Sequence, residues 1–264
     1  MKGLTWLTPS RLVCGVGFHT LEGRKDSMNA MNQKGHLSRR NLLKFGAGVV
    51  GTGALTAGLG SKLVFPDQAV AQNDMTPDQA LQSLMDGNKR FVTEKRVNPR
   101  QNLARLAEIA QVQKPFASIL SCADSRVPSE IIFDQGFGDL FICRVAGNIA
   151  TPEEIGSLEF GSLVLGSKVI MVIGHEKCGA VDATIKGAQV PGQIASLLDA
   201  IRHALRRSEG KTGDRLENAT KANVLYQIEK LKASPVISQL IEEDKLKVVG
   251  GYYDLDTGTV TMVS

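Results

Sequence analysis

Two short stretches of the sequence carry five side chains of the kinds that bind metals or move protons. Cys122, Asp124 and Arg126 alternate directly after one apolar run, and His175 and Cys178 directly follow a second. Cysteine thiolate and imidazole are ligands that zinc prefers, and a His-x-x-Cys step can turn both side chains onto one ion. Three protein ligands leave a fourth position for water or substrate, which is typical of a catalytic zinc. The pattern therefore predicts a zinc site formed by Cys122, His175 and Cys178.

The two apolar runs are expected to bring these residues together. Residues 117–120 and 169–174 are almost continuously apolar, as strands buried on both faces of a parallel sheet are. Ligands of open α/β sheets bind at the carboxyl ends of the strands. Both groups of candidate residues follow a strand in this way, which favours a shared site over two buried cysteines and an unrelated core histidine.

The pair Asp124 and Arg126 adds acid–base chemistry to the metal ligands. A guanidinium fork binds a carboxylate through two hydrogen bonds and keeps it ionised. An ionised Asp124 could then accept a hydrogen bond from zinc-bound hydroxide and fix its direction. The alternative is a surface ion pair of little energetic value. The position of the pair, between a metal ligand and the next helical turn, favours the functional interpretation.

Helical and strand patterns alternate along the rest of the chain. Strands separated by helices imply a mostly parallel sheet, and a turn at 256–258 returns the last strand as an antiparallel neighbour. The predicted fold class is α/β, with a mostly parallel sheet of about four strands, an antiparallel edge strand and flanking helices. The predicted helices cover 76–95, 102–113, 128–133, 151–165, 180–186, 194–206, 219–233 and 235–243, and the predicted strands cover 117–120, 140–145, 169–174, 246–253 and 259–263.

Two helix starts have the sequence of a capping box with proline at the first helical position. They are Thr76-Pro77-Asp78-Gln79 and Thr151-Pro152-Glu153-Glu154. In each we expect the threonine hydroxyl to accept a hydrogen bond from the backbone N–H three residues later. Polar residues 208–218 are predicted to form a loop.

Charge is distributed unevenly along the chain of 264 residues. The formal net charge is +4, but residues 1–71 contain nine Lys and Arg against three Asp and Glu. Subtraction from the totals of 31 and 27 leaves 22 basic and 24 acidic residues in 72–264, a net charge of −2. The basic character belongs to the amino-terminal segment, so we expect no nucleic-acid partner.

Four cysteines are present, Cys14, Cys122, Cys143 and Cys178. Three remain after residue 71, and an odd number does not suit a disulfide framework. Cys143 lies in the apolar stretch 140–145, where we interpret it as a small buried hydrophobe. A non-catalytic protein that binds zinc or senses oxidants through these thiols is an alternative, but it would not need a carboxylate held beside the metal.

The amino-terminal segment resembles a secretory signal of the twin-arginine class. Arg39 and Arg40 precede an uncharged apolar stretch, 45–60, and an Ala-Val-Ala site ends at Ala71. This order predicts export by the twin-arginine machinery and cleavage near Ala71, with the periplasm or a thylakoid lumen as destination. An uncleaved membrane anchor is the alternative, although the stretch is shorter than the roughly 20 residues of a spanning helix.

The domain organisation follows from this signal. Residues 1–71 are interpreted as the leader, and 72–264 as a single domain. Twin-arginine signals begin close to the start of translation, so residues 1–30 are expected to be untranslated, with Met28 or Met31 as the true start.

Three segments closely resemble the β-class carbonic anhydrases: CADSRV at 122–127, IIFDQGFGDLFICRVAGN at 131–148 and GHEKCGA at 174–180. The resemblance covers nearly all of residues 76–264. It implies an enzyme with one Zn²⁺ per chain that converts carbon dioxide to bicarbonate and a proton, reversibly, by zinc-bound hydroxide. It also implies an α/β homodimer, or a higher even oligomer, with active sites at the dimer interface. Related proteins hydrolyse carbon disulfide or carbonyl sulfide on the same fold, so hydrolysis of one of these compounds is an alternative activity.

The resemblance also assigns roles to single residues. Cys122, His175 and Cys178 are implied as the zinc ligands, and Asp124 with Arg126 as the pair that orients the hydroxide. Four further positions match substrate-binding positions of the family, and they are Gln113, Gly179, Phe141 and Phe160.

One departure from the family pattern concerns regulation. Some members have a non-catalytic bicarbonate site built on a tryptophan, an arginine and a tyrosine. The single tryptophan here is Trp6, in the leader. We therefore expect the constitutively open form of the enzyme.

Overall fold

The computed structural model describes residues 74–264. The expected signal, its twin-arginine pair, its cleavage site near Ala71 and the start of translation lie outside these residues. Within the described part, no helix combines the length and the apolar character required to cross a membrane.

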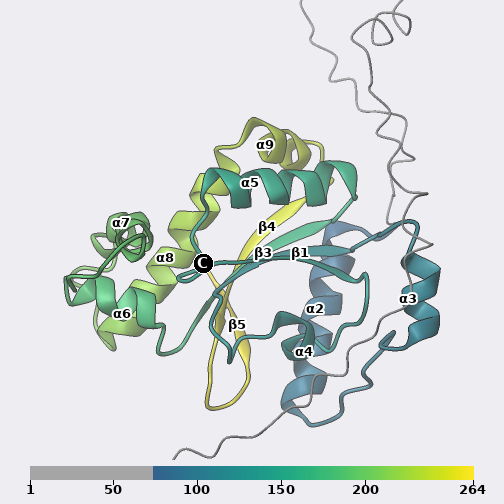
Figure 1. The fold of residues 1–264 in the computed structure, drawn as a ribbon, viewed down its shortest axis with the longest axis horizontal. Helices are drawn as coiled ribbons and strands as arrows, with labels where there is room; N and C mark the ends of the chain where they lie inside the picture. Colours follow the sequence, from purple (N-terminus) through teal and green to yellow (C-terminus); the bar gives the residue numbers. More distant parts are fainter. Residues whose placement is uncertain (1–73) are drawn as a thin grey trace, which may run out of the picture. The chain divides into compact units, whose positions relative to one another are not determined.

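A five-stranded sheet forms the centre of the described chain (Figure 1). The spatial order is β2-β1-β3-β4-β5, in which the first four strands are parallel and β5 is antiparallel to β4. The predicted fold class is thus confirmed. The strands are β1 (Ala117–Ser121), β2 (Leu140–Arg144), β3 (Val169–His175), β4 (Lys247–Tyr253) and β5 (Val260–Val263).

Helices cover both faces of this sheet. Figure 1 shows α5 and α9 on one side, α2 and α4 on the other, and α6 and α7 together at one end. The helices are α2 (Pro77–Val92), α3 (Leu103–Ile109), α4 (Ser129–Ile132), α5 (Pro152–Glu159), α6 (Gly179–Ile185), α7 (Ile194–Leu205), α8 (Arg215–Lys232) and α9 (Pro235–Glu242).

The central strands are buried on both faces, as their continuous apolar sequences predict. Alternate residues of β1 and β3 join opposite core clusters: Ile119 and Met171 pack with side chains of α2 and α4, and Leu120 and Val172 pack with α5, α8 and α9. Full burial of one such side chain contributes about 2 kcal/mol. The two layers therefore fix the register in which β1 and β3 end, and with it the position of the residues that follow them.

Three helices depart from their predicted bounds by four residues or more, and the others by fewer. The helix predicted over 219–233 begins at Arg215, because the Asp214 side chain accepts a hydrogen bond from the N–H of Glu217 at 2.7 Å and caps it. The helix predicted over 151–165 is α-helical only to Glu159 and continues as one π-helical turn, Phe160–Val164. Helix α3 ends at Ile109, earlier than predicted.

One of the two predicted capping boxes is confirmed and the other is wrong. Thr76 Oγ1 accepts from the N–H of Gln79 at 3.2 Å, and the Gln79 side chain accepts from the N–H of Thr76 at 2.8 Å. The Thr151 hydroxyl instead donates to the carboxylates of Glu153, at 2.8 Å, and Glu154. With two carboxylates competing for it, this hydroxyl does not cap the backbone of α5.

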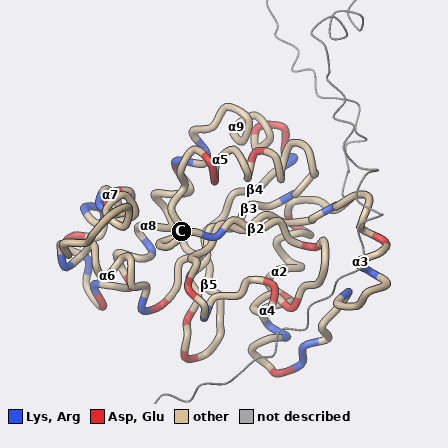
Figure 2. Tube along the Cα trace, in the orientation of Figure 1, with Lys and Arg blue, Asp and Glu red and all other residues tan. Residues whose placement is uncertain are grey.

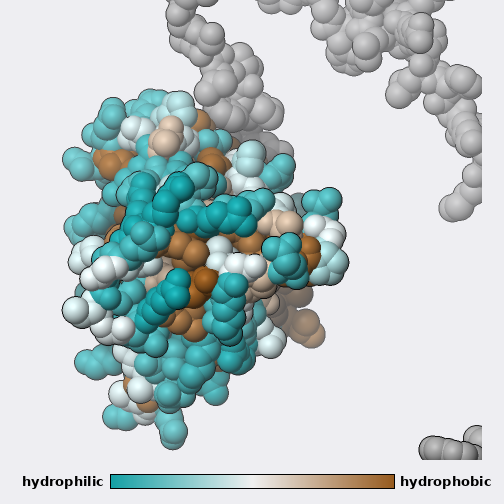
Figure 3. Space-filling model, turned by 90° about the vertical axis from the view of Figure 1, so that its left-hand side faces the viewer, coloured by the Kyte–Doolittle hydropathy of each residue, from teal (hydrophilic) through white to brown (hydrophobic). Residues whose placement is uncertain are grey.

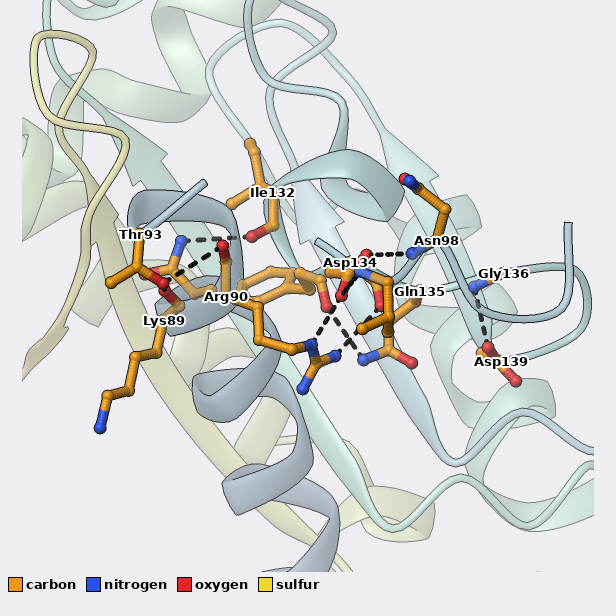
Figure 4. A network of polar contacts seen from close by, with 12 residues as sticks. Lys89, Arg90, Thr93, Asn98, Ile132, Asp134, Gln135, Gly136 and Asp139 are labelled. Atoms are coloured by element: carbon orange, nitrogen blue, oxygen red, sulfur yellow. Dashed lines mark hydrogen bonds and ion pairs between the residues drawn. The ribbon is translucent and has the colours of Figure 1, made fainter. Parts of the chain in front are cut away.

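Charged residues of both signs are interspersed along the described chain (Figure 2). Two carboxylates in it are buried, Asp134 and Asp139. Asp134, at φ +47°, accepts hydrogen bonds from Arg90 Nε at 2.6 Å and from the N–H groups of Val97 and Asn98 at 3.1 and 2.9 Å (Figure 4). Burial acts to raise the pKa of Asp134, but these hydrogen bonds outweigh it and lower the pKa. The segment after α2 is thereby fastened to the loop that precedes β2.

Candidate metal centre

The three predicted metal ligands meet at the carboxyl ends of β1 and β3. Cys122 follows β1, His175 is the last residue of β3, and Cys178 lies at the amino end of α6. Because β1 and β3 are paired in parallel with Ser121 opposite Ile173, both strands end at one place. The sulfur atoms and a ring nitrogen lie within 4.8 Å of one another, and all three residues are buried.

The His175 ring is oriented as a ligand through Nε2. Its Nδ1 lies 2.8 Å from the carbonyl oxygen of Glu176, which makes Nδ1 the donor and leaves Nε2 with a free lone pair. Nε2 is buried and has no hydrogen-bond partner within residues 74–264. A buried polar atom without a partner is unusual in a folded protein, and a metal ion would satisfy this one.

The two cysteines supply the anionic part of the site. The hydrogen bond from the Cys178 thiol, which outweighs burial, lowers the pKa of Cys122, and the hydrogen bond from the Gly147 N–H adds to this effect. The same bond to Cys122, together with burial, raises the pKa of Cys178. One thiolate is thus favoured before any metal binds. Two sulfurs and an imidazole nitrogen at this spacing form a donor set that fits a soft or borderline divalent ion.

Asp124 and Arg126 form the predicted pair beside the ligands. Arg126 donates from Nε to Asp124 Oδ1 at 2.9 Å and from Nη2 to Oδ2 at 2.8 Å, and its backbone N–H reaches Oδ1 at 2.9 Å. The Arg126 side chain holds the pKa of Asp124 well below its usual range. Oδ2 lies 3.9 Å from His175 Nε2, so an ionised, acceptor-only oxygen borders the metal ligands.

Arg144 is a further contributor that the sequence reasoning missed. From the end of β2, its Nε donates to the carbonyl oxygen of Cys122 at 3.1 Å, and its Nη2 donates to that of Asp124. Arg144 therefore fixes the backbone on both sides of residue 123. The available signal was a charged residue at the end of an apolar strand that runs parallel to β1.

The four predicted substrate residues separate into two groups. Gly179 begins α6 directly after Cys178, and a Cβ added to it would meet no atom of the described chain within 4 Å. Gln113 is exposed and precedes β1, so the whole strand, roughly 16 Å at 3.3 Å per residue, separates it from Cys122.

Phe141 and Phe160 also lie away from the metal ligands of their own chain. Their ring centroids are 6.4 Å apart. Phe141 is paired with Ser118, near the start of β1, and Phe160 is 47% exposed. Within one chain, the structure therefore brings Gly179 to the metal ligands but not Gln113, Phe141 or Phe160.

Comparison with known proteins gives one consistent family. A family model described as carbonic anhydrase matches residues 117–260. "Carbonic anhydrase 2" of Mycobacterium tuberculosis is 35% identical over 191 residues, which are 70% of this chain and 92% of that protein.

Solved structures agree with this match in their fold. A β-carbonic anhydrase from Coccomyxa, solved in complex with acetazolamide, is similar with a TM-score of 0.55 and 25% identity over 69% of this chain and 86% of its own. A tetrameric β-carbonic anhydrase of Sordaria macrospora is similar with a TM-score of 0.57 and 23% identity over 70% of this chain and 96% of its own.

Proposed function

Because the chain belongs to the β-class carbonic anhydrase family, we propose that its metal centre catalyses the reversible hydration of carbon dioxide to bicarbonate and a proton. The convergence of Cys122, His175 and Cys178 beside an ionised Asp124 is the observation that carries the proposal. A site for storage or sensing would need the three ligands but not a carboxylate locked in place by an arginine.

The metal is proposed to be zinc, one ion per chain, held by Cys122, His175 and Cys178. Bound zinc acts as a Lewis acid that brings the pKa of a water molecule down to near neutrality. The protein contributes the anionic sulfurs, the fixed ring of His175 and the burial that keeps other ligands away.

Asp124 and Arg126 are proposed to orient the reactants. Arg126 uses three hydrogen bonds to fix both oxygens of Asp124, so the carboxylate has one direction and remains an acceptor. An acceptor-only group binds an oxygen that carries a proton and repels one that does not. Asp124 thus selects the protonated oxygen of the nucleophile and of bicarbonate, and the unprotonated oxygens must turn towards other groups, such as the backbone at Gly179.

A homodimer is proposed to complete each site. Gln113, Phe141 and Phe160 lie too far from the ligands of their own chain, yet Gln113 and Phe160 are exposed and can meet a second copy. Helix α3 buries none of its residues against the described chain and exposes apolar side chains nearby, namely Leu103, Leu106 and Val112. Apolar surface also shows between hydrophilic ridges on the face of the molecule that carries α6 and α7 (Figure 3). Such surface marks a site of association.

Complementation between two inactive variants tests this arrangement. Chains with Asp124→Asn and chains with Gln113→Ala are each expected to be poorly active. If Gln113 acts on the partner's metal centre, a mixed dimer contains one site with both wild-type residues, and mixing restores activity. Mixing without any gain, under conditions in which exchange of chains is demonstrated, would place Gln113 in its own chain's site or outside the chemistry.

The leader is proposed to direct export through the twin-arginine machinery to the periplasm or a thylakoid lumen, leaving a single domain from residue 72. The support is the sequence order of Arg39–Arg40, the apolar stretch and the site ending at Ala71. Lysine at both arginine positions should leave the precursor unprocessed. Amino-terminal sequencing of the precursor and of the mature protein tests translation from Met28 or Met31 and cleavage at Ala71.

The test of the catalytic proposal is stopped-flow hydration of carbon dioxide by purified residues 72–264, with zinc measured on the same sample. Rapid hydration with about one zinc per chain, inhibited by acetazolamide, is the expected result. Full zinc occupancy without hydration from neutral to alkaline pH would refute it, and carbon disulfide and carbonyl sulfide would then be the substrates to test.

A further inference from the structure

Helix α8 carries two fully buried amide side chains that connect to the Cys122 sulfur through the turn after β2. Asn223 and Gln227 are both 0% exposed. Gln227 Nε2 donates to Asn223 Oδ1 at 2.9 Å, and Asn223 Nδ2 donates to the carbonyl oxygen of Gly147 at 2.8 Å. The N–H of the same glycine donates to Cys122 Sγ at 3.3 Å. A continuous chain of hydrogen bonds thus runs from the interior of α8 to a metal ligand.

The turn between these groups is held at both ends. Gln227 Oε1 accepts from the N–H of Ala150 at 2.9 Å, so Gln227 holds the end of the turn and Asn223 its beginning. Gly147 has φ +76°, and a Cβ at this position would lie 2.5 Å from Ile201 Cδ1 of α7. The backbone at Gly147 is therefore confined between α7 and α8.

We propose that Asn223 and Gln227 are positioning residues of the metal centre, which hold the Gly147 N–H in its hydrogen bond to the Cys122 sulfur. The inference rests on the proposed zinc site. A hydrogen bond to a thiolate stabilises its charge and limits how strongly the sulfur donates to the metal. Side chains outside the ligand set that orient ligands commonly change metal affinity by about 10- to 100-fold when they are replaced.

Two substitutions by apolar residues of similar length remove this support, and a third serves as the control. Asn223→Leu removes the donor to Gly147, and Gln227→Met removes the bonds to Ala150 and Asn223. Thr220→Val is the matched control, because Thr220 lies on the same helix, is 1% exposed, and has a hydroxyl without a hydrogen-bond partner in the described chain.

The zinc Kd, measured by competition with a chromophoric chelator, is expected to rise about tenfold for Asn223→Leu. We expect a smaller rise for Gln227→Met and no change for Thr220→Val. With cobalt in place of zinc, the thiolate-to-metal charge-transfer band of Asn223→Leu should move to longer wavelength. The reason is that the Cys122 sulfur loses the hydrogen bond from the Gly147 N–H, which stabilises its negative charge. Thermal unfolding is recorded in parallel.

An unchanged Kd and an unchanged cobalt band in Asn223→Leu, with only a lower Tm, would reduce the amide pair to a structural role and overturn the proposal. If Asn223→Leu does not fold, the zinc Kd and the cobalt band of Gln227→Met decide whether the proposal holds. The wild-type protein gives an independent answer: with NMR-active cadmium, a scalar coupling from the metal to the Gly147 amide proton is expected, and its absence contradicts the proposal. A wild-type protein that binds no metal would instead overturn the proposed function itself.

Discussion

Asp134→Asn tests the hydrogen-bond network that fastens the segment after α2 to the loop before β2. Asparagine is nearly the same size and also tolerates the left-handed backbone at φ +47°, so the change is confined to one oxygen. If its carbonyl oxygen keeps the bond from Asn98, its NH₂ replaces Oδ2 and faces two donors, Arg90 Nε and the N–H of Val97. Two bonds to a buried carboxylate are lost.

The magnitude follows from these two bonds. Each hydrogen bond to a charged group contributes about 1.5–3 kcal/mol, which gives an upper range of about 3–6 kcal/mol. The Arg90 side chain is 32% exposed and can turn to water, so we expect the lower end, about 3 kcal/mol. In a domain of this size, that loss lowers Tm by about 6–12 °C.

The assay is urea unfolding of wild type and Asp134→Asn at pH 7, repeated at falling pH. Since the folded-state pKa of Asp134 is lowered, its stabilisation is complete above the unfolded pKa of about 3.9 and is lost as pH falls through the folded pKa. The difference between the two proteins should therefore shrink only in acid below about pH 4.

Asp244→Asn is the matched control, because Asp244 has a similar backbone conformation, φ +53°, but an exposed side chain. We expect a change within about 0.5 kcal/mol. If Asp134→Asn is no less stable at pH 7 than this control, the three hydrogen bonds do not stabilise the fold and the reasoning is refuted.

Three further comparisons test the site and the fold. Asp124→Asn should keep full zinc occupancy by metal analysis while kcat falls by about a hundredfold, because its NH₂ would face the donors of Arg126; undiminished kcat would remove Asp124 from the mechanism. Thr76→Ala should cost about 1 kcal/mol in chemical unfolding, as loss of a capping hydroxyl does, whereas Thr151→Ala should cost under about 0.5 kcal/mol; equal losses would contradict the difference between the two helix starts. Gly250→Ala should lower the free energy of unfolding by about 1–3 kcal/mol through overpacking against α8, and an unchanged stability would count against the close packing of α8 on β4. Gly179→Ala should leave the stability unchanged while altering KM.

The metal ligands and the fold class could be predicted because both depend on local patterns. The apolar runs that became β1 and β3 are long, unbroken and followed directly by Cys122 and His175, so the strand ends and the ligands coincide in sequence. The pair Asp124 and Arg126 lies within three residues, and its geometry follows from one turn of backbone. The error at Thr151 arose because two carboxylates lie within reach of its hydroxyl, and sequence spacing does not resolve which partner it takes. The start of α8 was placed four residues late because polar residues 208–218 were interpreted as a loop, although Asp214 is a residue type that caps helices.

The sequence by itself therefore determined which residues can bind a metal, which strands present them and the class of sheet, because side-chain chemistry and apolar periodicity act over short distances. Only the tertiary structure decided which distant groups support the site. Arg144 and the buried pair Asn223 and Gln227 reach Cys122 through its backbone or through the turn at Gly147. These relations arise from the packing of α7, α8 and β2 around two strand ends, and no local pattern of residues specifies that packing.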